Sequence, residues 1–127
     1  MLYTSSFSKY RDLPPTVVPV AITTDVPYHY EGCKFDGLTP SDDLLSMCKA
    51  RNNWELFKTL YHRECLVDLK PADVYKKLMD LGNGRDVCLL THESPDNNES
   101  VRSILIGWFT TAGLPCEEFN FRRNGNA

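Results

Sequence analysis

The hydrophobic pattern is clearest in the last third of the chain. Residues 87–90 form a short apolar run without alternation, which is typical of a strand buried on both faces. The polar residues 91–98 that follow contain a proline and predict a loop. From about Glu99, apolar residues recur at a spacing of three and four and predict a helix ending at Gly113. These residues are Val101, Ile104, Leu105, Trp108 and Phe109. Strand, loop and helix in this order form half of a crossover unit.

Three other segments have the composition of strands. Residues 2–4 predict a first short strand, and residues 117–121 alternate weakly and predict a last one. The β-rich run 16–24 predicts a second strand, and Pro19 within it indicates a sheet edge or a bulge. Residues 25–39 show no periodicity and predict an ordered loop, a candidate flap over a site at the strand ends.

The middle of the chain predicts three helices. The first follows the capping signals of residues 39–43 and runs to about Ala50. The second has an asparagine cap at residue 52 or 53 and one apolar face, formed by Trp54, Phe57, Leu60, Tyr61 and Cys65. The third spans residues 71–81 and ends at Gly82, with Val74, Leu78 and Leu81 inward.

These elements predict one α/β domain over residues 1–127. We expect a three-layer arrangement in which a mostly parallel, Rossmann-like sheet of four to five strands is flanked by helices. The polar residues from about 122 predict a flexible tail. A chain of 127 residues with 42% hydrophobic content is long enough for one core.

Charge and cysteine content narrow the function classes. Fourteen basic residues against 17 acidic ones give a net charge of −3, which argues against a broad, nonspecific nucleic-acid surface. The five cysteines form no C-x-x-C pair and indicate reduced thiols in a cytosol. No apolar run approaches the ~20 residues of a membrane span, and the N-terminus lacks a signal-peptide profile, so we expect a cytoplasmic protein with no membrane partner. The oligomeric state is left open.

Candidate site residues lie where strands are predicted to end, because ligands of open α/β sheets bind beyond the carboxyl ends of strands. Glu93 follows the buried strand, where partial desolvation would raise its pKa and suit acid/base catalysis. Arg102, one turn into the next helix, either binds an anionic group or pairs with Glu93 and pins the loop. The other expected ligand-binding residues are Ser6, Ser8 and Lys9 after the first strand, and Thr24 and Asp25 after the second.

Other chemistries lack their sequence signatures. There is no glycine-rich phosphate loop and no serine nucleophile elbow. His29, His62 and His92 are separated from the cysteines, so we expect neither a metal site nor a cofactor. Cys88 lies inside the apolar run and is predicted to be core. His29 either stacks on a base or packs on the surface, and His62 points away from the apolar face of its helix.

Three segments read together resemble the domain-of-unknown-function family 488. They are residues 5–10 (SSFSKY), residues 18–22 (VPVAI) and residues 89–95 (LLTHESP), the last leading to Arg102 and Trp108. The resemblance covers nearly the whole chain. Family members carry a cysteine, any residue, a glutamate and a proline, then a cysteine-histidine-arginine triplet that opens a helix.

This chain keeps part of that family pattern. Glu93 and Pro95 match it, and Arg102 matches with one inserted residue. Thr91 replaces the first cysteine, and Ser100 and Val101 replace the cysteine and histidine of the triplet. The resemblance therefore implies the scaffold and the Glu/Arg pair without the thiol or metal chemistry of the lost residues.

Two functions follow as expectations. The first is binding of a nucleotide-, nucleoside- or nucleic-acid-like ligand at the C-terminal edge of the sheet, with Glu93 as catalytic acid/base if the ligand is also turned over. The hydroxyl groups and two opposed charges expected there suit a sugar, nucleoside or nucleotide. The second is a non-enzymatic interaction protein that keeps the family scaffold without its chemistry.

Overall fold

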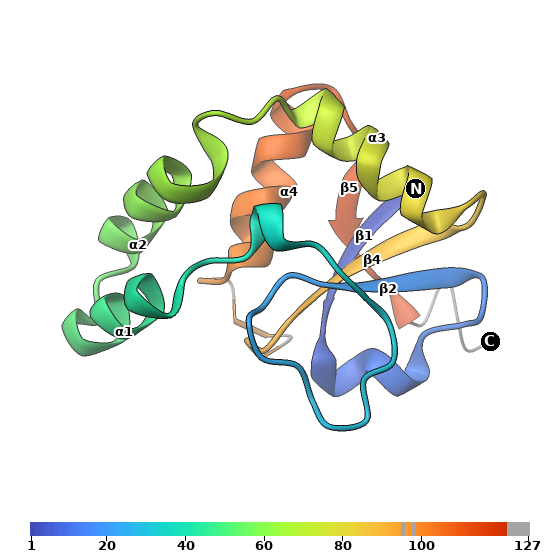
Figure 1. The fold of residues 1–127 in the computed structure, drawn as a ribbon, viewed down its shortest axis with the longest axis horizontal. Helices are drawn as coiled ribbons and strands as arrows, with labels where there is room; N and C mark the ends of the chain where they lie inside the picture. The colour runs from blue at the N-terminus through green and yellow to red at the C-terminus, as the bar shows by residue number, and fades with distance from the viewer. Residues whose placement is uncertain (95, 98, 122–127) are drawn as a thin grey trace.

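A five-stranded, all-parallel sheet forms the centre of the structure, a computed structural model (Figure 1). The structure describes residues 1–94, 96, 97 and 99–121, with the backbone alone at 48–51, so the predicted tail from about 122 lies outside it. The strand order is β3-β2-β4-β1-β5. The strands are β1 (Leu2–Ser6), β2 (Val17–Ala21), β3 (Cys33–Lys34), β4 (Asp86–Thr91) and β5 (Cys116–Glu118).

The apolar run of residues 87–90 forms the central strand, as predicted. Strand β4 pairs with β1 on one side, from Leu2↔Val87 to Ser6↔Thr91, and with β2 on the other. Val87 and Leu89 join the larger core cluster beneath the helices, whereas Cys88 and Leu90 join a smaller cluster on the opposite face. Both faces of the strand are covered, which explains the absence of alternation in its sequence.

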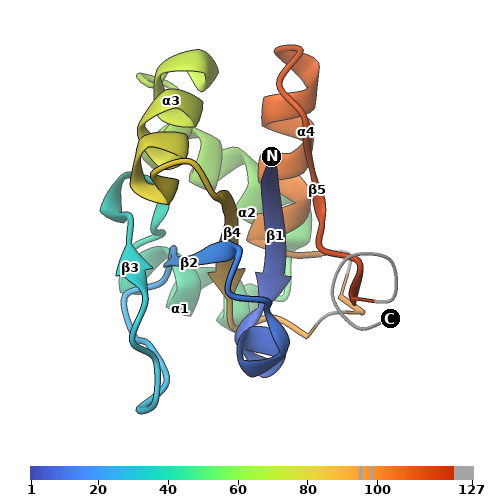
Figure 2. The same ribbon diagram turned by 90° about the vertical axis from the view of Figure 1, so that its right-hand side faces the viewer.

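The helices and the connecting segments take opposite faces of the sheet (Figure 2). One face packs against α1 (Asp42–Arg51), α2 (Trp54–Tyr61), α3 (Pro71–Gly82) and α4 (Val101–Thr111). The other face is covered by the 3-10 segment η1 (Phe7–Asp12), by Val26 and Tyr30 of the loop after β2, and by Phe119 and Phe121 after β5. The predicted three-layer α/β class is confirmed, with short segments in place of long helices in the third layer.

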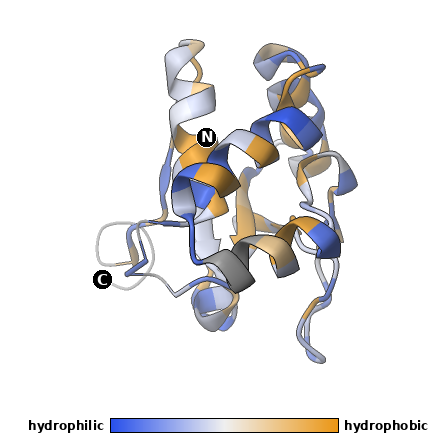
Figure 3. Cartoon of the chain, turned by 90° about the vertical axis from the view of Figure 1, so that its left-hand side faces the viewer, coloured by the Kyte–Doolittle hydropathy of each residue, from blue (hydrophilic) through white to orange (hydrophobic). Residues whose placement is uncertain are grey.

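The direction of the connections explains this division. The connections from β1 to β2 and from β2 to β3 run one way along the strand order, and those from β3 to β4 and from β4 to β5 run the other way. Crossovers between parallel strands are right-handed, so a reversal of direction places the connection on the opposite face. The α-helices follow the second direction and therefore share one face, where Figure 3 shows hydrophobic strands between helices of mixed hydropathy.

Three local details differ from the sequence predictions. Residues 25–39 contain β3 and a 3-10 turn, η2 (Asp36–Leu38), because a two-residue strand has no periodicity to detect. Leu81 is 40% exposed, so its predicted inward position is wrong. The buried stripe of α3 runs through Val74, Leu78 and Gly82 instead, at a spacing of four. The helix stops at Asn83, whose φ of 50° is left-handed.

Pro19 lies in β2, which has a neighbouring strand on each side but pairs with β3 over only two residues. Strand β3 pairs with Val20 and Ala21, leaving the β3 side of Pro19 without a ladder partner. The Pro19 carbonyl oxygen accepts a hydrogen bond of 3.1 Å from the Tyr30 hydroxyl instead. Proline fits here because no neighbouring strand requires its missing N–H.

Helix α1 is capped by Ser41, and Glu64 from a later segment holds that capping residue in place. Ser41 Oγ accepts a hydrogen bond of 3.1 Å from the Leu44 N–H. Glu64, in the π-helical turn η3 (His62–Leu66), in turn accepts hydrogen bonds from the Ser41 N–H at 3.0 Å and from its hydroxyl at 2.6 Å. Burial alone would raise the pKa of Glu64, but the two bonds from Ser41 lower it below its ordinary value. The carboxylate thus joins η3 to the start of α1.

We predict that Glu64→Gln lowers the Tm by about 1–4 °C at pH 7, because this exposed carboxylate loses two charge-assisted hydrogen bonds. A lowered folded-state pKa contributes stability above the unfolded-state value and loses it as pH falls through the folded-state value. The difference from wild type should therefore shrink between about pH 5 and pH 3. Thermal denaturation across this range measures it. Glu55→Gln, an exposed carboxylate on α2, is the control, and a pH-independent difference would contradict the assignment.

Candidate functional site

The carboxyl ends of the strands meet at one edge of the sheet. Ser6 ends β1, Ala21 ends β2, Thr91 ends β4 and Glu118 ends β5. The chain leaves β4 toward the helical face, whereas it leaves β1 and β2 toward the opposite face. Ligands of open α/β sheets bind at such switch points, where neighbouring connections diverge. Both sides of β4 therefore present candidate crevices.

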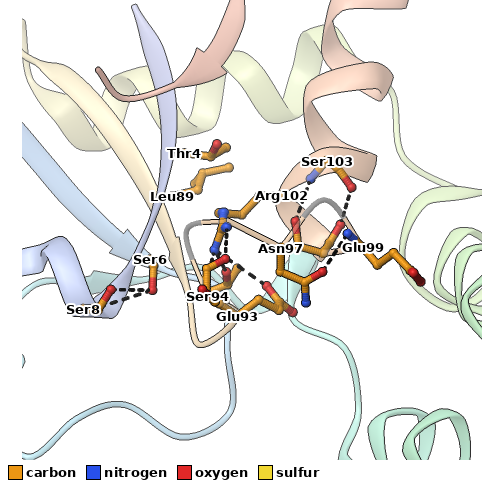
Figure 4. A network of polar contacts seen from close by, with 12 residues as sticks. Thr4, Ser6, Ser8, Leu89, Glu93, Ser94, Asn97, Glu99, Arg102 and Ser103 are labelled. Atoms are coloured by element: carbon orange, nitrogen blue, oxygen red, sulfur yellow. Dashed lines mark hydrogen bonds and ion pairs between the residues drawn. The ribbon is translucent and has the colours of Figure 1, made fainter. Parts of the chain in front are cut away.

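The guanidinium of Arg102 lies beneath the loop after β4. Ser100 caps α4 and places Arg102 in the first helical turn, where its side chain is 2% exposed. Its Nη1 atom donates to Thr91 Oγ1 at 2.8 Å and to the Glu93 carbonyl oxygen at 2.9 Å. Its Nη2 atom donates to the Ser94 carbonyl oxygen at 2.9 Å (Figure 4). Three hydrogen bonds fix the start of the loop to the helix.

Two carboxylates accompany this buried cation. Glu93 Oε1 lies 4.0 Å from Arg102 Nη1, and Glu118 Oε1 lies 3.2 Å from Arg102 Nε. The second contact is an ion pair without hydrogen-bond alignment, since the Nε–H has no hydrogen-bond partner among the described residues. Glu118 Oε1 also accepts a hydrogen bond of 2.5 Å from the Thr4 hydroxyl. Arg102 thereby joins the ends of β4 and β5.

The residues predicted after the first strand form a separate group. Ser6 is buried and caps η1, accepting hydrogen bonds from the Ser8 N–H at 3.3 Å and from the Ser8 hydroxyl at 3.1 Å. Figure 4 shows this pair to one side of the Arg102 network. Lys9 is exposed on η1. Ser6, Ser8, Lys9 and Arg102 do not line the cavities described next, whereas Thr24, Asp25 and Glu93 come together at one of them.

The strand-end cavity, of about 120 Å³, lies between the ends of β2 and β4. Its polar walls are Thr23, Thr24, Asp25, Asp42, Thr91, His92 and Glu93, and its apolar walls are Ile22, Pro40, Leu45 and Val101. His92 Nε2 lies 2.8 Å from the Asp25 carbonyl oxygen, and the His92 ring packs against Phe7 with centroids 4.7 Å apart. These contacts join the segment after β4 to the segment after β2.

The helix-pair cleft, of about 570 Å³, lies between the α1–α2 turn and the loop after β4. It is lined by Leu45, Asn52, Asn53, Trp54, Phe57, Glu93, Asn97 and Glu99. Asn52 has a left-handed φ of 49° in the turn, and the Asn53 side chain caps α2 by accepting a hydrogen bond from the Leu56 N–H. The Trp54 and Phe57 rings stack with an interplanar angle of 13°.

Sequence reasoning missed most of this cleft. It placed Trp54 and Phe57 on the apolar face of a helix and used an asparagine as a helix cap, and both features are present. Neither feature indicates that this end of α2 lies beside Glu93, about 40 residues further along the chain. The missed signal is a tryptophan directly after two asparagines, which brings stacking and amide groups to one helix end.

The described part of the chain lacks clustered metal ligands, and three of its thiols have a raised pKa. No group of three or more His, Cys, Asp or Glu side chains there is arranged to hold a metal ion. Burial raises the pKa of Cys65 and of Cys116 to about 12, and that of buried Cys88 well above its ordinary value. These three thiols are protonated at neutral pH and are poor nucleophiles.

Comparisons with models of known families, with curated proteins and with solved structures found no match to this chain. The resemblance to family 488 therefore stays a prediction from its motif residues. Within the described residues, no helix has the length and apolar character needed to cross a membrane.

We predict that Arg102→Met lowers the free energy of unfolding by about 3 kcal/mol, because it leaves Glu93 and two loop carbonyl groups without their buried cation. This value is at the low end for breaking a buried ion pair, since Glu118 is partly exposed. Chemical denaturation measures the change. Arg63→Met, which removes an exposed cation, is the control. A loss below about 1 kcal/mol for Arg102→Met would contradict the role assigned to the guanidinium.

Proposed function

We propose that this protein binds a nucleoside-like ligand in the helix-pair cleft, at the C-terminal edge of the sheet. The observation that supports this proposal is the meeting of Glu93 with the stacked Trp54 and Phe57 rings in one cleft. A carboxylate from the sheet edge and an aromatic surface from α2 provide two kinds of contact that a nucleoside uses.

The chemistry of the cleft suits each part of such a ligand. Aromatic side chains stack on the flat face of any nucleobase. The amides of Asn52, Asn53 and Asn97 both donate and accept hydrogen bonds, as the edges of bases require. Glu93 and Glu99 accept hydrogen bonds from ribose hydroxyls or from amino groups. A volume of about 570 Å³ lies within the usual range for small-molecule sites.

The charge of the cleft favours a nucleoside over a nucleotide or nucleic acid. Among the residues that the structure describes, neither lysine nor arginine lines the cleft, whereas two glutamates do. Arg102, the cation nearest to Glu93, is buried and donates to three protein oxygen atoms. A phosphate group would meet negative charge without a compensating cation from the described side chains.

An enzymatic role for this site would rest on its carboxylates. Glycosidic bonds are hydrolysed by pairs of Asp or Glu residues, and Glu93 and Glu99 both line the cleft. Glu93 is the residue we assign to acid/base catalysis, because it also lies beside the guanidinium that fixes the loop. Cleavage of an N-glycosidic bond would release a free base and a sugar.

The second candidate is a non-enzymatic interaction protein. Ser100 caps α4 and Val101 is buried, so the positions at which family 488 carries cysteine and histidine have structural roles here. Leu45 and Met47 on α1 are 38% and 36% exposed, which is a feature of binding surfaces. We also propose a cytoplasmic location, which the free thiols of Cys33, Cys65, Cys88 and Cys116 support.

We predict that a nucleoside from a panel of adenosine, guanosine, cytidine, uridine and thymidine raises the Tm of the wild-type protein. A ligand at one hundred times its Kd stabilises by roughly 2.7 kcal/mol, which is readily measured in a thermal-shift assay. Glu93→Gln and Trp54→Leu should each remove most of this shift, because they remove the carboxylate and the stacking surface.

Glu31→Gln, at an exposed glutamate outside the cleft, should keep the full shift. Mass spectrometry of the mixture separates the two roles: release of free base identifies a hydrolase, and an intact ligand identifies a binding protein. No shift with any nucleoside, or a full shift with both cleft variants, would refute the proposed function.

A further inference from the structure

We propose that the ligand of the helix-pair cleft carries a cationic amine, which enters the strand-end cavity. This inference rests on the proposed function and specifies the class of ligand. It treats the two cavities as parts of one binding site, in which the cleft takes the flat ring and the smaller cavity takes the charged end.

The two cavities share walls. Leu45 and Glu93 line both the helix-pair cleft and the strand-end cavity, and no other residue does so among those described. Leu45 is 38% exposed on α1, and Glu93 comes from the loop after β4. A ligand bound against Trp54 therefore reaches the smaller cavity by passing between one aliphatic side chain and one carboxylate.

The charge of the smaller cavity determines what enters it. Asp25, Asp42 and Glu93 line it, and within the described part of the chain neither lysine nor arginine does. No described cation makes an ion pair with Asp25 or Asp42. Among the described wall residues, the only other titratable one is His92, whose Nε2 atom is engaged with the Asp25 carbonyl oxygen at 2.8 Å. Glu93 already lies 4.0 Å from Arg102 Nη1, so the charges left for a ligand are those of Asp25 and Asp42, which leave room for one positive charge.

The hydrogen bonding of the cavity walls also favours a ligand that donates. Glu93 Oε1 is buried and accepts no hydrogen bond from a described residue, although a buried acceptor normally has a partner. Thr23 Oγ1 and His92 both contact the Asp25 carbonyl oxygen, which holds this segment at the cavity wall. An ammonium group has three N–H donors and no acceptor, so it satisfies carboxylates from several directions.

The size and geometry of the cavity favour an amine over a metal ion. About 120 Å³ holds a small group such as an aminomethyl, since a water molecule occupies roughly 30 Å³ in the liquid. The carboxylates do not converge as metal ligands, because the described residues contain no group of three arranged around a common point. An amine on a sugar can contact them one at a time.

Adenosine and two of its derivatives test the inference by calorimetry at pH 7. We expect 5′-amino-5′-deoxyadenosine to bind at least about tenfold more tightly than adenosine, the effect of one hydrogen-bonded charge. Adenosine 5′-monophosphate should bind more weakly than adenosine, because its phosphate meets the same carboxylates. If the nucleoside found by thermal shift has another base, its own 5′-amino and 5′-phosphate derivatives replace these.

Two variants of α1, at neighbouring aspartates, test whether the preference for the amine depends on the strand-end cavity. Asp42→Asn should reduce the preference for the amine over the neutral nucleoside, measured as the ratio of the two Kd values, by about tenfold. Asp43→Asn is the matched control, since it makes the same change one residue further along the same helical turn and does not line the cavity. Asp25→Asn should act as Asp42→Asn does.

The outcomes separate this inference from the proposed function. Binding of the neutral nucleoside without a preference for the amine overturns the inference and leaves the proposed function in place. Equal effects of Asp42→Asn and Asp43→Asn also overturn the inference, because they would indicate a general charge effect. Failure of every derivative to bind overturns both. A preference for the amine that Asp42→Asn removes and Asp43→Asn retains supports the inference.

Discussion

The arrangement of the strand-end edge depends on one buried cation. Removing a guanidinium from water is costly unless protein oxygens replace its hydration shell. Arg102 meets this requirement with a hydroxyl from the end of β4, two carbonyl oxygens of the following loop and two carboxylates. Because these groups belong to different elements, satisfying the charge fixes β4, β5, the loop and α4 relative to one another. The position of Glu93 follows from this constraint.

The burial of Arg102 also determines which side chains of the candidate site are exposed to its cavities. In the proposed site, Arg102 donates to protein oxygens, so contacts with a ligand would come from the cavity-lining side chains, which carry negative charge, amides and aromatic rings. The α1–α2 turn supplies two of the three amides, Asn52 and Asn53, and the start of α2 supplies the stacked rings of Trp54 and Phe57. The loop after β4 supplies Glu93 at a position that Arg102 fixes, and the helix pair forms the opposite side of the cleft.

Sequence periodicity identified the helices and the longer strands, but it did not identify β3 or show which elements meet at the candidate site. The unbroken run at residues 87–90 identified the central strand, and the spacing of Val101, Leu105 and Phe109 identified α4. Both patterns involve residues close together in sequence, so they can be recognised without knowledge of the fold. Trp54 and Glu93 line one cleft because of how α1 and α2 are placed relative to the sheet. A local sequence pattern contains no information about that placement. The sequence left two alternatives for Arg102, binding an anion or pinning the loop, and the structure shows contacts of the second kind with the carbonyl oxygens of Glu93 and Ser94.

The strand order also bears on how the chain is made. Strand β4 lies between β1 and β2, yet its residues are synthesised after the first 85 of the chain. Until they emerge from the ribosome, β1 has no partner within the sheet, and β2 has only the two residues of β3. Nascent chains in this condition expose unpaired strand edges. Assembly of the core therefore waits for the synthesis of residues 86–91, and a chain truncated before β4 would lack the strand that joins the two halves of the sheet.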